Sequence, residues 1–276
     1  MASSAERSAA APPFTAIVLA AQRGGRLDPL ADRFGVSHKC LVPIVGKPLL
    51  EHVLRALAGV PGLSRIHISI EKDAVAAVRQ VPGAKGEFGV PVEFVPAAPS
   101  LADSVYAAAH GVDEPLVVTT ADNVNLSPAT VAEMARRMHA GAEGVLVVAT
   151  KEAVLAAHPD GQRRFYKLRD ASYSNCNLYG INGPRALRMA ETFRSGGQFA
   201  KNPKRLAETF GLLNLLLVRF GLISIDGAAK RMSRQFDVRV EAQVVSDGSE
   251  AIDVDNSRTY DVAKELLERR RRAQGH

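Results

Sequence analysis

The sequence has no tryptophan, only two cysteines and only 5% aromatic residues among its 276 positions. Few aromatic side chains argue against a surface that stacks on nucleic-acid bases. Cys40 and Cys176 are too few for a disulfide framework and do not have the spacing of metal ligands. We therefore expect two reduced core thiols in a cytoplasmic protein. No apolar run has the length that a bilayer crossing requires, so we expect no transmembrane segment.

Charge is close to balanced, with 35 basic and 29 acidic residues and a formal net charge of +6. Part of the excess lies in 269–272, which we interpret as a solvated helix end and not as a nucleic-acid patch. Residues 1–13 are small, polar and proline-ended, without an apolar signal region, and predict a disordered tail. Residues 14–276 are enough to form one domain with a sizeable core.

Strand and helix patterns alternate through the first 150 residues. Strand patterns occupy 14–21, 65–70, 91–95, 116–120 and 145–149, with helical patterns between them. Ser127 and Pro128 have the residue types of a helix start. This alternation predicts an α/β fold whose mostly parallel central sheet is covered by helices on both faces.

The second half, 151–276, has a different pattern. It contains strand patterns at 163–168, 177–181 and 238–245, and a final helix over 257–272 for which Ser257 is the expected cap. A helical insertion spans about 184–236 and includes the apolar run 212–218. We interpret this run as a packed helix or a homodimer contact. The alternative is a peripheral membrane contact through 205–223, because basic residues bracket the run.

A long loop without periodicity, 22–39, follows the first strand. Structureless loops longer than about 12–15 residues are uncommon in compact domains and are usually functional or disordered. This one holds Gly24, Gly25 and several basic residues. Glycines let backbone N–H groups approach oxygen ligands, and basic side chains supply the opposing charge. Because ligands of parallel sheets bind beyond the carboxyl ends of the strands, we expect this loop and Asp122 to share one edge.

The segments LAAQRGGRL (19–27) and HKCLVPIVGKPLLEHVL (38–54) carry a specific resemblance. They resemble the signature of MobA-like NTP transferases, the nucleotidyltransferases that make activated sugars, polyols and cofactors. The resemblance places Arg26 and Lys39 on catalytic positions, and it makes 14–150 the nucleotide-binding half and 151–276 the acceptor-binding half. It also implies that the nucleotide contacts Ala20, Ala21, Gln22, Arg23, Gly24 and Gly25. The chain departs from the signature where Gln22 replaces the first glycine and His38 replaces a proline.

Weaker matches continue along the chain. Asp122 corresponds to the metal-binding aspartate of the family, and IDVDNS (252–257) is similar to the acidic element that closes the site. The resemblance gives Lys167 a role on the acceptor phosphate and places Asn177 in the acceptor pocket. Ser100, Asp103 and Ser104 lie where the family recognises the base.

Carboxylates from separate strands hold Mg²⁺, which completes its shell with phosphate oxygens and water. Asp122 and Asp255 are the expected pair. Asp253 is the alternative, because alternate residues of an extended chain point to opposite faces. Arg26 and Lys39 would hold the triphosphate and stabilise the charge that gathers on it.

The resulting prediction is a Mg²⁺-dependent nucleotidyltransferase. It would transfer a nucleoside monophosphate from an NTP, with CTP as the expected donor, to a phosphorylated sugar, polyol or related small acceptor and release pyrophosphate. A glycosyltransferase of the related nucleotide-sugar fold would instead need Asp-x-Asp after the central strand, where this chain has Ala121-Asp122-Asn123. A third reading, a non-catalytic nucleotide-binding sensor, is kept open by Gln22.

Overall fold

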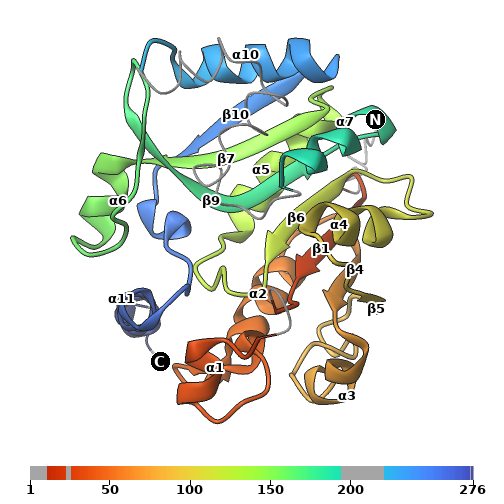
Figure 1. The fold of residues 1–276 in the computed structure, drawn as a ribbon, viewed down its shortest axis with the longest axis vertical. Helices are drawn as coiled ribbons and strands as arrows, with labels where there is room; N and C mark the ends of the chain where they lie inside the picture. Colours follow the sequence, from red (N-terminus) through yellow and green to blue (C-terminus); the bar gives the residue numbers. More distant parts are fainter. Residues whose placement is uncertain (1–10, 23–25, 194–220, 274, 276) are drawn as a thin grey trace, which may run out of the picture.

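A computed structural model describes residues 11–22, 26–193, 221–273 and 275. Within this part of the chain an eight-stranded sheet has the order β10-β7-β9-β6-β1-β4-β5, with β8 paired to β9 (Figure 1). Its strands are β1 (Phe14–Leu19), β4 (Leu63–Ile70), β5 (Val92–Pro96), β6 (Leu116–Thr120), β7 (Gly144–Thr150), β8 (Tyr166–Lys167), β9 (Ser172–Ile181) and β10 (Val240–Val245). A separate hairpin joins β2 (Pro43–Ile44) to β3 (Lys47–Pro48).

Helices cover both faces of this sheet. They are α1 (Pro29–Arg33), α2 (Leu49–Ala58), α3 (Val75–Val78), α4 (Leu101–Ala109), α5 (Pro128–His139), α6 (Lys151–Ala157), α7 (Pro184–Leu187), α10 (Ile225–Phe236) and α11 (Ser257–Ala273). Short 3-10 turns lie at Lys39–Leu41, Lys72–Ala74, Arg188–Phe193 (η4) and Gly248–Ala251 (η6). The core divides accordingly: α2, α5, α6 and α11 contribute to one cluster, and α4, α7 and α10 contribute to the other (Figure 1).

The sheet is mostly parallel, which confirms the predicted fold class. β1 pairs in parallel with β4 and β6, β4 with β5, and β7 with β10. β9 is the exception, because it runs antiparallel between β6 and β7. Strands from both halves of the sequence therefore belong to one sheet, and the carboxyl ends of its parallel strands meet at a common edge.

The central strand is buried because its sequence is apolar at every position except Thr15. Within β1, Phe14, Ala16, Ile17 and Val18 are fully buried, since helices cover the sheet on both sides. The strand ends at Leu19, before the predicted end at 21, and Ala20 and Ala21 continue it as irregular chain. Backbone bonds to Ser69 O and from Ala121 N hold this exit in place.

Two predicted helix caps differ in detail. Ser127 lies at the N-cap position of α5, but its side chain makes no capping bond; its amide instead donates to Glu250 Oε2 at 3.3 Å. At α11 the cap is Asn256 and not Ser257, because Asn256 Oδ1 accepts from the amides of Arg258 and Thr259. A further helix that the sequence analysis did not predict is α6, which follows β7 directly.

Several predictions concern residues outside the described part of the chain. These include most of the predicted tail (1–10) and the apolar run of the insertion (212–218), with its proposed dimer or membrane contact. The described parts of the insertion are α7, η4 and α10. Of the helices that the structure describes, none is both long enough and apolar enough to span a bilayer.

Candidate active site

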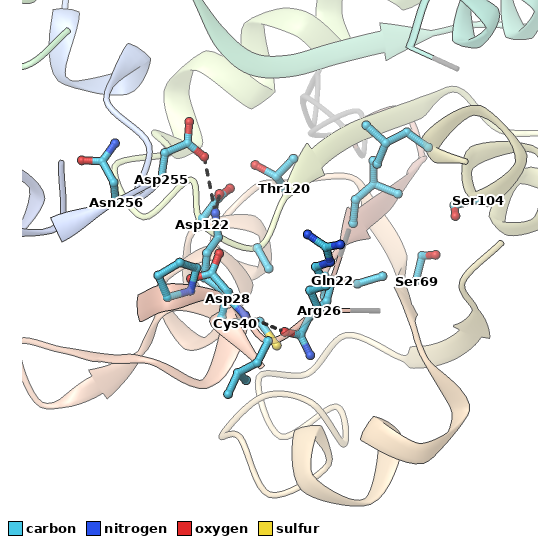
Figure 2. A pocket seen from close by; sticks show the side chains of 18 of the residues that line it. Gln22, Arg26, Asp28, Cys40, Ser69, Ser104, Thr120, Asp122, Asp255 and Asn256 are labelled. Carbon is cyan, nitrogen blue, oxygen red and sulfur yellow. Dashed lines mark hydrogen bonds and ion pairs between the residues drawn. The ribbon is translucent and has the colours of Figure 1, made fainter. Parts of the chain in front are cut away.

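A cavity of about 1080 Å³ opens at the carboxyl edge of the sheet, beyond the ends of β1 and β6 (Figure 2). Its walls come from the exit of β1 with the start of α1, the turn at Lys39–Cys40, Ser69 of β4, the start of α4, the end of β6, and the segments 162–164 and 255–258. The last two stretches belong to the second half of the sequence. The predicted convergence of the early loop and Asp122 on one edge is therefore what the structure shows.

Three carboxylates gather on one side of this cavity. One oxygen each from Asp122, Asp253 and Asp255 lies within 4.8 Å of the others. Asp122 follows β6, and the other two precede α11. A backbone bond from Val254 N to Asp122 O (3.1 Å) joins the two segments directly. The side-chain Nδ2 of Asn125 donates to Ile252 O (3.1 Å) and strengthens the same junction.

Asp253 and Asp255 approach each other because the chain turns between them. The amide of Asp255 donates to Asp253 O at 3.1 Å, a bond that closes a three-residue turn. The alternation of an extended strand, on which the choice between the two residues was based, does not apply to this turn. Thr259 Oγ1 accepts from the Asp255 amide (2.9 Å), which fixes the turn to the first turn of α11.

Lys39 lies among these acids. Its Nζ is 2.5 Å from Asp122 Oδ2 and 3.4 Å from Asp255 Oδ1. Burial alone would lower the pKa of Lys39, but Asp122 and Asp255 outweigh burial and raise it above its usual value. Burial would likewise raise the pKa of Asp122, yet the Lys39 ammonium holds it below its usual range. The pair is therefore ionised, and the ammonium offsets part of the acidic charge.

The cluster fits a divalent cation in two further respects. Asp122 Oδ1 is buried without a hydrogen-bond partner among the described residues. Burial, together with the charges of Asp255 and Asp122, raises the pKa of Asp253 to about 8. Carboxylates crowded in this way favour a bound cation, which relieves their repulsion. Hard oxygen ligands of this kind suit Mg²⁺.

Side chains outside the cluster orient Asp253. Gln162 Nε2 donates to Asp253 Oδ1 (3.1 Å), and Asn177 Nδ2 donates to Asp253 Oδ2 (2.9 Å). Asn177 reaches this position because β9 has an irregular register there and Asn177 adopts a positive φ of 48°. Such a bulge redirects a side chain out of the normal alternation. Asn177 thus contacts the acidic cluster. It does not belong to the described residues that line the cavity.

The 22–39 loop reaches both sides of the cavity: its start lies across from the acids, and Lys39 at its end lies among them (Figure 2). Ala20, Ala21, Gln22 and Arg26 line the cavity. The predicted contacts Arg23, Gly24 and Gly25 lie outside the described residues. Figure 2 shows Arg26 beside Gln22, across the opening from Asp122 and Asp255.

Of the three predicted base-recognition residues, only Ser104 lines the cavity. Ser100 caps α4: its Oγ accepts from the Asp103 amide (3.1 Å) and donates to Asp103 Oδ2 (2.7 Å). Ser104 Oγ accepts from the Ala98 amide at 3.0 Å and so fixes the chain that enters the helix. Ser100 and Asp103 thus have a local structural function that their spacing, S-x-x-D, could have indicated.

Two arginines that the sequence analysis did not select, Arg163 and Arg164, line the cavity. Lys167, predicted to meet the acceptor, is exposed on β8 and is not part of the described lining. Arg258 holds the chain just before the two arginines, because its Nη1 donates to the carbonyls of Asp160 and Gly161. In the sequence, the pair of arginines a few residues before Lys167 was the available signal.

Both cysteines are core residues, as predicted. Cys40 and Cys176 are each 2% exposed and unpaired. Burial and then the Glu71 carboxylate raise the pKa of the Cys40 thiol to about 12, and burial raises that of Cys176. Thiolate is the reactive form, so we expect neither thiol to react with a disulfide reagent at pH 8 in the native protein and both to react in guanidinium. Rapid native reaction of either thiol would contradict this burial.

Comparison with known proteins agrees with this geometry. The profile of the MobA-like NTP transferase domain matches residues 16–187, more than half of the chain. The chain belongs to this family. Among curated proteins the comparison finds no match.

The chain is also similar in structure to several solved proteins. A hypothetical transferase from Thermus thermophilus has 28% identity and a TM-score of 0.71, and the alignment covers 90% of this chain and 99% of that one. A CMP:2-keto-3-deoxy-manno-octonic acid synthetase complexed with CTP has 16% identity and a TM-score of 0.55, covering 94% and 99%. The 4-diphosphocytidyl-2C-methyl-D-erythritol synthase of Anaerococcus prevotii has 13% identity and a TM-score of 0.58, covering 94% and 97%. The last two share the fold.

Proposed function

We propose that this MobA-like protein transfers a nucleoside monophosphate from an NTP to a phosphorylated sugar, polyol or related small acceptor, with release of pyrophosphate. The observation that carries the proposal is one cavity with three convergent carboxylates and Lys39 on one side and Arg26 on the other. Such a cavity suits an anionic ligand that brings a metal ion with it. CTP is the first donor to test, since the fold is shared with a synthetase solved with CTP.

Asp122, Asp253 and Asp255 would hold the Mg²⁺. When bound, the ion would supply charge neutralisation for the phosphate oxygens. Asp122 is the anchor of this set, because it is the carboxylate with an unpartnered buried oxygen. Gln162 and Asn177 hold Asp253 in orientation through its two oxygens.

The basic residues would position the two reactants. An oxygen of the acceptor phosphate attacks the α-phosphorus, and the bond between that phosphorus and the bridging oxygen to pyrophosphate breaks. Both reactants are anions, so positioning and charge neutralisation supply most of the catalysis. Arg26 and Lys39 would bind the triphosphate. Arg163 and Arg164, which line the cavity, would bind the acceptor phosphate, and Lys167 follows them on the exposed strand.

Pyrophosphate release tests the proposal. The four common NTPs are each combined with MgCl₂ and a panel of sugar and polyol phosphates, and pyrophosphate is measured with a coupled assay. We expect release that requires an NTP, the metal and a phosphorylated acceptor together. Consumption of a nucleotide sugar without pyrophosphate would indicate the glycosyltransferase, and nucleotide binding without turnover would indicate the sensor; either result would overturn the proposal.

The acceptor assignment predicts a selective effect. Replacing both Arg163 and Arg164 with alanine should raise the KM for the acceptor phosphate by at least about 100-fold, since each charge-assisted hydrogen bond is worth roughly 1.5–3 kcal/mol and two are lost. The affinity for NTP, measured by calorimetry, should stay within about twofold. Lys167→Ala is the matched comparison, and we expect it to have the smaller effect. A larger effect of Lys167→Ala would indicate that the acceptor phosphate binds at Lys167 on β8, and not at the two arginines.

A further inference from the structure

The two positions at which this chain departs from the family signature lie against the same carboxylate. Gln22 replaces a glycine and His38 replaces a proline, and Glu71 lies between them at the end of β4. The amide of Gln22 donates to Glu71 Oε1 at 2.8 Å. His38 Nε2 is 3.6 Å from Glu71 Oε2. Gln22 and His38, which are separate in the sequence, thus both contact the carboxylate of Glu71.

The side chain of Gln22 makes two more bonds, and each reaches a different segment of the site. Gln22 Oε1 accepts from the Asp28 amide at 3.1 Å, and Gln22 Nε2 donates to Ser37 O at 2.9 Å. Asp28 follows Arg26 closely, and Ser37 precedes Lys39 closely. One glutamine therefore connects the segment that carries Arg26 with the segment that carries Lys39. A glycine would keep the amide bond to Glu71 and lose both connections.

Glutamine in place of the family's glycine at position 22 changes how this part of the site can bind a phosphate. A glycine at this position serves a close approach of backbone amides to phosphate. Here the Gln22 amide is already bonded to Glu71, whose carboxylate would repel a phosphate at that point. Binding of the triphosphate then depends more strongly on the two cations. Cations stabilise phosphate charge best when their positions are fixed before the ligand arrives.

We propose that Gln22 is a positioning residue that fixes Arg26 relative to Lys39 for the triphosphate. The inference rests on the proposed function, because it presupposes that these cations bind an NTP. His38 supports the same arrangement from the Lys39 side, since its Nδ1 lies 3.0 Å from Ser37 Oγ.

The test is a double-mutant cycle on Gln22 and Arg26. Gln22→Met keeps the length of the side chain and removes both hydrogen bonds, and Gln22→Gly restores the family residue. Each is made alone and together with Arg26→Ala. Binding of CTP, GTP, UTP and ATP, each with MgCl₂, is measured by calorimetry. Gln80→Met, on an exposed turn away from the cavity, is the matched control.

We expect Gln22→Met and Gln22→Gly each to weaken binding of the preferred NTP by about tenfold, the effect of losing two hydrogen bonds. In the Arg26→Ala background the same changes should cost less than about threefold, because the cation that Gln22 positions is gone. A simply destabilised protein would show equal losses in both backgrounds. Gln80→Met should bind as the wild type does.

The outcomes separate this inference from the proposed function. If the wild type binds an NTP and turns over but Gln22→Met binds it equally well, the role of Gln22 is wrong while the transferase stands. Equal losses of NTP affinity from the Gln22 substitutions in the wild-type and Arg26→Ala backgrounds would also overturn the positioning role of Gln22. If the wild type binds none of the four NTPs, both are wrong. Circular dichroism of every variant verifies that each one is folded.

Discussion

Asp122→Asn is expected to lower the rate of pyrophosphate release by at least about a thousandfold, with the protein still folded. Asp122 has one oxygen paired with Lys39 at 2.5 Å, and its other oxygen is buried and unpartnered among the described residues. Asparagine is nearly isosteric but removes the charge that a divalent cation and the Lys39 ammonium both require. The substitution therefore affects the metal and the main cation of the site together.

Asp261→Asn is the matched control, since Asp261 is an exposed carboxylate on α11. Its turnover should equal that of the wild type. Asp122→Ala serves as a second variant and should be equally inactive. Circular dichroism establishes the folded state of all three. If Asp122→Asn kept more than about a tenth of the wild-type rate at saturating Mg²⁺, the assignment of the metal to this cluster would be wrong.

Gly248→Ala is expected to lower the free energy of unfolding by about 3 kcal/mol or more, at the upper end of the usual cost of overpacking. A Cβ on Gly248 would lie 2.1 Å from Ala153 C and 2.2 Å from Val154 N. These are backbone atoms of α6, which cannot rotate away as a side chain can. Either α6 or η6 must shift, and η6 leads directly into Asp253.

Gly59→Ala is the control for Gly248→Ala. Gly59 has a φ of −77°, and a Cβ there would be no closer than 3.5 Å to any neighbour. We expect a change within about 1 kcal/mol, in either direction. Urea denaturation, with the slope compared between variants, measures both. Equal stability of the two variants would show that η6 and α6 are not packed as described.

The sequence predicted those features that depend on local patterns. The apolar run of β1 requires a strand buried on both faces, and the strand-helix alternation after it leads to a mostly parallel sheet. The phosphate-binding role of the loop with Gly24 and Gly25 stays a prediction, since both glycines lie outside the described residues. Asp122 was located correctly at the edge of the sheet because it directly follows a recognisable strand. Each of these inferences uses residues within one element or one loop.

Features that depend on pairing between distant segments were not predictable. The position of β9 between β6 and β7 is a long-range choice that its own residues do not specify. The choice between Asp253 and Asp255 stays a prediction, but the strand alternation on which it was based does not hold, because a backbone bond turns the chain there and no residue type marks such a bond. The two partners of the Gln22 side chain are backbone atoms, Asp28 N and Ser37 O, which any sequence would have. Arg163 and Arg164 carried a visible signal, but their direction depends on how Arg258 fixes their segment.

Binding of Mn²⁺ in the presence and absence of NTP, followed by electron paramagnetic resonance, tests the central claim most directly. The claim is that the acids beyond β6 and before α11 bind a metal ion together with a triphosphate. We predict one Mn²⁺ site per chain whose affinity rises when the preferred NTP is added, and which Asp122→Asn removes. Mn²⁺ affinity that does not respond to any NTP, or that survives in Asp122→Asn, would contradict the account.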